Sequence, residues 1–208
     1  MNNSVRNSLV VFLVVIGIGF LLALAGSQGG TMVGKYPLFA LTVALAFLIQ
    51  WLAFIPAYLL QTEKFYDMTG SVTYIIAAVT AVSFSKGVDA RSILLLGLVV
   101  IWAVRLGAFL FRRVHKAGKD GRFDEIKPNF FRFLNAWTIQ GLWVAFTASA
   151  ALVAITSTHR KELDLFAIFG FLVWLIGIAI EVAADSQKSR FNAEFANKGK
   201  FKIGRAHV

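Results

Sequence analysis

The sequence has no cysteine, only three prolines and few charged residues for its length. The absence of cysteine excludes disulfides, thiolate metal sites and cysteine nucleophiles. Charged residues make up 15% of the 208 residues, whereas hydrophobic residues make up 58% and the mean hydropathy is +0.70. This composition is far more apolar than that of a soluble domain, so it indicates one polytopic membrane domain rather than two domains.

Acidic residues are also scarce, at 11 against 21 lysines and arginines, which gives a formal net charge of +10. This excess does not indicate a nucleic-acid partner, because the basic residues gather in loops and no basic face alternates with exposed aromatics. In a membrane protein, basic residues instead mark the cytoplasmic side and contact membrane lipids.

Apolar runs close to the length of a bilayer predict an all-α bundle of six membrane spans. They cover about 9–25, 37–60, 72–84, 92–111, 133–155 and 165–184. The last span runs without proline into a polar, basic stretch, which predicts a cytosolic amphipathic helix. The first span has an alternative, because Ala23-Leu24-Ala25 after an apolar run is typical of a cleaved signal peptide. Its length favours a retained helix.

The distribution of lysine and arginine predicts the topology. The loop 112–132 has seven and the tail from 188 has six, so that with Arg6 and Lys64 one side carries fifteen. The opposite side carries five, and Arg105 lies within a span. Both termini are therefore expected in the cytoplasm. The basic cluster His159-Arg160-Lys161 fits least well, because it falls on the outer side.

Arg105 is an intramembrane cation, and such residues are costly unless they face the bundle interior and find a partner. One interpretation is a structural ion pair with Asp67, Glu181 or Asp185, or snorkelling toward the interface. The other is a functional site. The predicted topology places all of these groups at similar depth on the cytoplasmic side, as a site entered from the cytosol would require.

Glu181 and Asp185 are four residues apart and share one helical face. They could balance Arg105 or Arg112, or bind a metal, although the absence of a matching histidine pair argues against a metal. They could also accept hydrogen bonds from a cofactor's amide or ribose hydroxyls.

Asp67 follows Tyr66 in the polar stretch before the third span. Its spacing favours a helix cap, made by Asp67, Thr69 or Ser71. The functional alternative is a proton donor or relay. The loop 112–127 is strongly basic, which suits topology and lipid headgroups or a phosphorylated ligand. His115 is expected there as a solvated loop residue.

Several ordered motifs resemble one family. The segment 181–191, EVAADSQKSRF, followed by 197–201, NKGKF, closely resembles bacterial membrane proteins related to steroid 5-alpha-reductases. The stretches 64–71 (KFYDMTGS), 102–107 (WAVRLG) with Arg112-Arg113, and 118–124 (GKDGRFD) also look like family motifs. The resemblance covers about 64–201.

The resemblance implies a bundle of about six or seven membrane helices in the bacterial inner membrane. It implies an NADPH-dependent reduction of a carbon–carbon double bond conjugated to a ketone in a lipophilic small molecule. In such enzymes an acid and a tyrosine polarise the carbonyl oxygen. By position, the cofactor-binding residues are Glu181, Asp185, Arg190 and Arg105, and no metal is implied.

The catalytic acid implied by the resemblance is Asp67. Trp102 stands near the place of the family's tyrosine, so this chain departs there, and Tyr66 is the candidate substitute. Two rival functions remain open. One is a membrane methyltransferase of the isoprenylcysteine carboxyl type, which uses S-adenosylmethionine. The other is a non-enzymatic helical membrane protein or transporter component.

The end of the sequence departs from the family pattern. The family continues after Gly-Lys-Phe with a Gly-Leu-Trp segment and a Ser-Arg-His-Pro-Asn-Tyr-type motif, whereas this chain reads KIGRAHV over 202–208. We therefore expect one incomplete domain over 1–201, a non-native tail over 202–208, and no catalytic turnover by this polypeptide. Sequence does not set the oligomeric state.

Overall fold

The computed structural model describes residues 3–117 and 120–194, with side chains over 5–115 and 120–194. The chain forms two compact units, 1–162 and 163–208, and each is considered by itself. The expected tail over 202–208 and the motif over 197–201 lie outside the described residues. The expectation of one domain over 1–201 stays a prediction.

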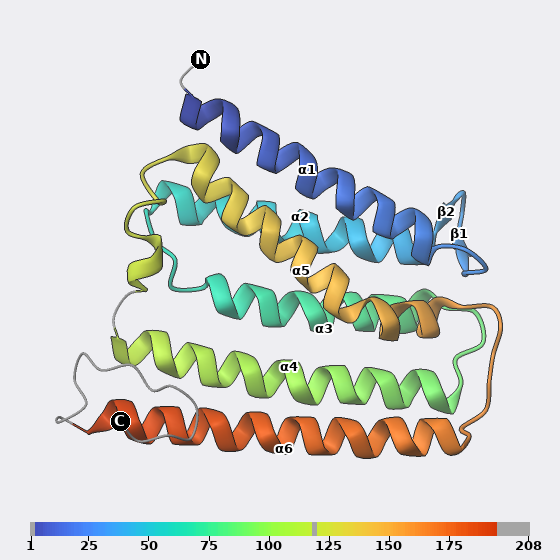
Figure 1. The fold of residues 1–208 in the computed structure, drawn as a ribbon. Helices are drawn as coiled ribbons and strands as arrows, with labels where there is room; N and C mark the ends of the chain where they lie inside the picture. Colours follow the sequence, from blue (N-terminus) through green and yellow to red (C-terminus); the bar gives the residue numbers. More distant parts are fainter. Residues whose placement is uncertain (1–2, 118–119, 195–208) are drawn as a thin grey trace. The chain divides into compact units, whose positions relative to one another are not determined.

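The first unit contains five long helices that run alternately in opposite directions (Figure 1). Its elements are α1 Asn3–Gly26, β1 Met32–Val33, β2 Tyr36–Pro37, α2 Leu38–Leu59, α3 Tyr66–Phe84, α4 Ala90–Ala117, the 3-10 turn η1 Gly121–Phe123 and α5 Phe130–Thr156. The second unit contains α6 Leu165–Ala193.

Within the described ranges, six helices are long and apolar enough to cross a membrane. The all-α polytopic fold is therefore confirmed, and the six helices indicate a membrane protein. The last helix also continues as expected from its apolar span into the polar stretch, through Arg190 to Ala193. The side of the membrane on which it ends stays a prediction.

The third span is longer than predicted, because α3 begins at Tyr66 rather than near residue 72. The predicted helix cap is wrong. The N-cap is Phe65, which makes no side-chain cap bond. The Thr69 and Ser71 hydroxyls instead donate to the carbonyls of Phe65 and Asp67, one turn back, at 2.8 and 3.3 Å. Hydroxyl side chains inside a helix commonly donate to the carbonyl four residues earlier. A cap would instead have to accept from a backbone N–H of the first turn, so these hydroxyls do not serve as caps.

Three other predicted spans were too short, at the start of α1, the end of α4 and the start of α5. The extension of α4 to Ala117 makes His115 a helical residue, so its prediction as a loop residue is wrong. Its imidazole stacks on the Phe111 ring, with centroids 6.0 Å apart and planes 16° apart. A stacking partner four residues earlier on the same helix explains why this polar residue stays helical.

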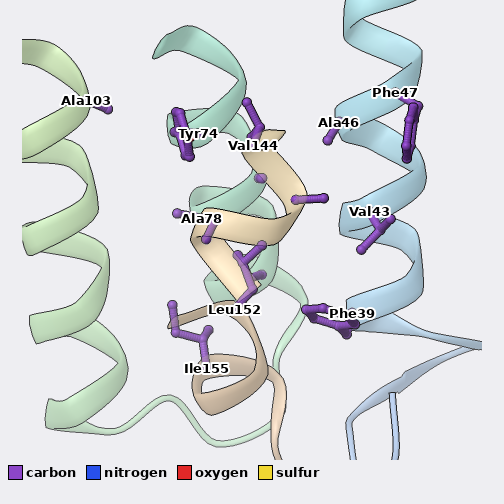
Figure 2. Close-up of a cluster of buried hydrophobic side chains, with 14 of the residues drawn as sticks. Phe39, Val43, Ala46, Phe47, Tyr74, Ala78, Ala103, Val144, Leu152 and Ile155 are labelled. Carbon is purple, nitrogen blue, oxygen red and sulfur yellow. The ribbon is translucent and has the colours of Figure 1, made fainter. Parts of the chain in front are cut away.

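The core of the first unit is built from large side chains that meet small ones. Figure 2 shows Phe39, Val43 and Phe47 of α2 on one side of α5, with Tyr74 of α3 and Ala103 of α4 on the other. Small residues let membrane helices approach closely and gain dispersion energy. At Gly107 an added Cβ would lie 2.9 Å from the Ser71 Cβ, so α3 and α4 are nearly in backbone contact there.

Polar side chains inside the first unit bridge neighbouring helices. Gln50 Nε2 of α2 donates to Thr73 Oγ1 of α3 at 2.9 Å. Asn135 Nδ2 of α5 donates to the Ser8 carbonyl of α1 at 2.8 Å, and this bond is buried. Because lipid offers no hydrogen-bonding partner, such bonds fix which helices pack together.

Arg160 ties two connecting segments together at the end of the bundle where α5 ends. Its guanidinium donates to Ser92 Oγ at 3.0 Å, Ser85 Oγ at 2.8 Å and the Lys86 carbonyl at 2.7 Å, with Asp89 Oδ1 at 3.9 Å. The basic cluster that fits the charge rule least well therefore contains an arginine with a structural role.

Substitution of Gly107 tests the close approach of α3 and α4. We expect Gly107→Val to lower the free energy of unfolding by about 1–3 kcal/mol, because overpacking forces the helices apart. Gly97→Val on the same helix is the control, since an added Cβ there meets nothing within 4 Å. Thermal unfolding in detergent measures both, and equal melting temperatures would contradict the packing.

Candidate functional site

Figure 1 shows that α2 and α4 end, and α3 and α5 begin, at the same end of the first unit. Polar side chains from these segments gather there. We call this group the end cluster. Its members are Glu63, Tyr66, Asp67, Arg113, Asp120, Arg122 and Lys127. They come from the α2–α3 connection, the first turn of α3, the end of α4 and the α4–α5 connection.

Asp67 pairs with Arg113 across the α3–α4 interface. Arg113 Nη2 donates to Asp67 Oδ2 at 3.1 Å, and the Asp67 side chain is 16% exposed while that of Arg113 is 39% exposed. A largely buried carboxylate needs such a partner. Since the cation remains partly open to solvent, the pair can also meet a ligand.

The Asp67–Arg113 pair is one of three successive contacts between α3 and α4. Ser71 faces Gly107, and Tyr74 packs edge-on against Trp102 with ring centroids 4.9 Å apart. The three α3 residues are spaced by four and then three positions, so they share one face. Two of the stretches that carry the family resemblance, 64–71 and 102–107 with Arg112-Arg113, therefore pack directly against each other.

Glu63 is the most deeply buried acid of the end cluster, with a side chain that is 3% exposed. Lys127 Nζ donates to its Oε2 at 2.6 Å, and the Asp120 backbone N–H donates to its Oε1 at 2.8 Å. Burial is the largest single influence and raises the pKa of Glu63, but the hydrogen bonds and the positive charge of Lys127 together hold the pKa below its ordinary value. Glu63 thus fixes the α4–α5 connection as an ionised acceptor.

The α4–α5 connection also has its own internal pair. Asp120 accepts from the Arg122 backbone N–H at 3.1 Å and from the Arg122 guanidinium. The Arg122 hydrogen bonds lower the pKa of Asp120, against the effect of burial. The third resembling stretch, 118–124, is therefore held in place where the structure describes it.

Tyr66 is enclosed by aromatic rings at the start of α3. Its ring packs edge-on against Phe123 and Trp137, with centroids 4.9 and 5.1 Å away. Its hydroxyl donates to the Ala136 carbonyl at 2.9 Å. The hydroxyl is committed to the backbone of α5 in this arrangement, and a catalytic role for Tyr66 stays a prediction.

The predicted site residues fall in both units. Tyr66 and Asp67 are neighbours on α3, and Arg105 lies on α4, half-buried, eight residues before Arg113. Glu181, Asp185 and Arg190 lie on α6 in the second unit, with Glu181 and Asp185 one turn apart. The expected convergence of Asp67, Arg105 and Asp185 on one cavity therefore stays a prediction. Among the described residues, no three histidine, aspartate or glutamate side chains form a group that could hold a metal ion.

Sequence reasoning missed Glu63 and Lys127. They are 64 residues apart, so no local spacing connects them. The available signal was an acid in the polar stretch between two apolar spans, which must be buried or paired if the connection packs against the helix ends.

The Glu63–Lys127 pair gives a pH-dependent prediction. We expect Glu63→Gln to lower the free energy of unfolding by about 3 kcal/mol at pH 7, because Lys127 loses its buried counter-ion. A carboxylate with a lowered folded pKa stabilises the fold above its unfolded value of 4.5, and this contribution is lost as the pH falls through the folded pKa. The difference between wild type and variant should therefore shrink in acid.

Thermal unfolding in detergent between neutral and acidic pH measures this difference. Glu125→Gln is the matched control, because Glu125 is exposed in the same connection. A constant gap between wild type and Glu63→Gln at every pH would contradict an ionised Glu63.

Comparison with curated proteins and with solved structures gives no match. A family model described as "Protein of unknown function (DUF1295)" matches residues 53–204. The match begins within α2, includes the end cluster, and covers more than half of the chain. The relation to steroid 5-alpha-reductases stays a prediction. The chain belongs to the DUF1295 family of proteins of unknown function.

Proposed function

We propose that this chain belongs to an integral-membrane reductase that uses NADPH to reduce a double bond conjugated to a carbonyl in a lipophilic substrate. The observation that supports this most is the meeting of three separate motif stretches in the end cluster. Asp67 contacts Arg113, and Tyr66 contacts Phe123. Polar residues from distant segments that gather at the end of apolar helices are typical of a functional site in a membrane protein.

The proposed cofactor residues are chemically suited to a dinucleotide. Glu181 and Asp185, one turn apart on α6, offer carboxylate acceptors for ribose hydroxyls or the amide, and Arg190 and Arg105 offer donors for phosphates. When bound, NADPH supplies the hydride for the β carbon of the substrate, and a proton added at the α carbon completes the reduction. The rival cofactor, S-adenosylmethionine, transfers a methyl group rather than a hydride, and no described feature favours it.

In this proposal Asp67 relays the proton, which its carboxylate takes up from water and passes on to the substrate. Arg113 fixes the direction of its carboxylate, so a substrate carbonyl that approaches the pair meets a positioned acid and a partly exposed guanidinium. A guanidinium near a carbonyl oxygen stabilises the negative charge that develops there during reduction. Tyr66 takes part only if its hydroxyl leaves the Ala136 carbonyl.

The proposed location is the bacterial inner membrane, with both termini and the end cluster in the cytoplasm. The end cluster lies beside the most basic loop of the sequence, which the positive-inside rule assigns to the cytoplasm. NADPH would then reach the site from the cytosol, while the substrate would enter from the bilayer.

Cofactor binding tests the proposal. We expect the full chain in detergent to bind NADPH and Asp185→Ala to bind at least about tenfold more weakly, because a charge-assisted hydrogen bond is lost. Asp67→Asn should bind NADPH like the wild type, since the acid acts on the substrate. Titration calorimetry measures the dissociation constants.

Glu125→Ala is the control for a change of surface charge, because Glu125 is an exposed acid of the α4–α5 connection. Undiminished binding by Asp185→Ala would remove Asp185 from the site. Binding of S-adenosylmethionine in place of NADPH would favour a methyltransferase, and binding of neither would favour a non-enzymatic membrane protein.

A further inference from the structure

A cavity of about 250 Å³ lies beside the end cluster, between the α2–α3 connection and the last turns of α4. It is lined by Lys64, Phe111, Val114 and His115. Two of these residues carry nitrogen donors and two are apolar. A wall of mixed character suits an amphiphilic ligand better than a purely polar one.

The cavity lies where the membrane boundary is expected. The apolar span of α4 ends at His115, and α2 ends at Leu59. Leu59 and Leu60 are more than 70% exposed, and Phe111 is 47% exposed, as is normal for side chains that face acyl chains. Lys64 and His115 then lie at the level of the lipid headgroups, where lysine and aromatic residues are enriched.

The charge beside the cavity is positive because the nearby carboxylates already have partners. Both oxygens of Glu63, the sequence neighbour of Lys64, accept hydrogen bonds from the α4–α5 connection. Asp67 is held by Arg113, and the exposed Arg112 adds a further cation at the end of α4. The local field therefore favours an anion.

The size of the cavity limits the ligand. Pockets that enclose drug-sized molecules measure roughly 300–1,000 Å³, so about 250 Å³ suits a headgroup fragment and is too small for a whole dinucleotide. The lining residues include none of the proposed cofactor residues, so the ligand of this cavity does not depend on the proposed reductase activity.

We infer that this cavity binds the phosphate of an anionic glycerophospholipid. Lys64 and His115 donate to the phosphate oxygens, and Phe111 and Val114 contact the glycerol and the start of the acyl chains. His115 stacks on Phe111, so the imidazole nitrogen and the apolar Phe111 ring lie side by side and can contact the same ligand. Basic pockets at the ends of membrane helices recognise lipid phosphates in this way.

A lipid titration tests the inference. The purified full chain in detergent is titrated with short-chain phosphatidylglycerol, and bound lipid is measured by native mass spectrometry. We expect the double variant Lys64→Gln/His115→Gln to bind about 25-fold more weakly than the wild type, since each headgroup contact contributes about fivefold. Lys64→Arg should keep most of the affinity because it keeps the charge.

The matched control is Lys86→Gln/His159→Gln, which removes the same residue types from exposed positions at the opposite end of the first unit. The control should bind like the wild type, and circular dichroism should give equal helix content for all variants. Equal loss in both double variants would overturn the site, because it would reflect general surface charge.

Two further titrations separate the possible sources of the phosphate. Phosphatidylcholine, whose headgroup has no net charge, should bind at least about tenfold more weakly than phosphatidylglycerol. Glycerol 3-phosphate should not displace the bound lipid at concentrations equal to those of phosphatidylglycerol. If it does, the site recognises a soluble phosphate ester and the lipid assignment is overturned.

Discussion

Glu63 holds together the end of the first unit on which the rest of its polar chemistry depends. Its two oxygens accept from Lys127 and from the Asp120 backbone, so one buried side chain fixes both ends of the described α4–α5 connection. With that connection in place, Phe123 lies against Tyr66, and the start of α3 is enclosed. A buried acid with fewer partners would be costly, so the full set of hydrogen bonds is what makes this arrangement stable.

The helices beneath the end cluster are positioned mainly by small residues and interhelical hydrogen bonds. Gly107 allows Ser71 to approach α4, and Gln50 bonds to Thr73 between α2 and α3. In a bilayer, burial of apolar surface does not by itself drive helices together, because lipid is equally apolar. Close packing and a few hydrogen bonds therefore decide which helix faces meet. The resulting packing of α3 on α4 places Asp67 beside Arg113.

The membrane spans were predictable from the sequence because length and apolarity are properties of each segment alone. The contacts between side chains of different helices were not predictable, because they depend on how the helices pack. Asp67 was expected to cap a helix, but α3 begins at Tyr66, so Asp67 lies inside its first turn. The Thr69 and Ser71 hydroxyls donate to the backbone carbonyls four residues earlier and cap nothing. Asp67 was one of three acids considered as a partner of Arg105, and the structure gives it a hydrogen bond from Arg113, eight residues further along α4. The same face of a helix offers several arginines, and only the packing of α3 on α4 selects among them.

The bond from Asn135 to the Ser8 carbonyl has a consequence for biosynthesis. It joins α1 to α5 across 127 residues of sequence. A ribosome that adds about 5–20 residues per second needs roughly 6–25 s to make that intervening stretch. During this interval α1 has left the exit tunnel without its later neighbour, so lipid or the insertion machinery must shelter the face that α5 finally covers.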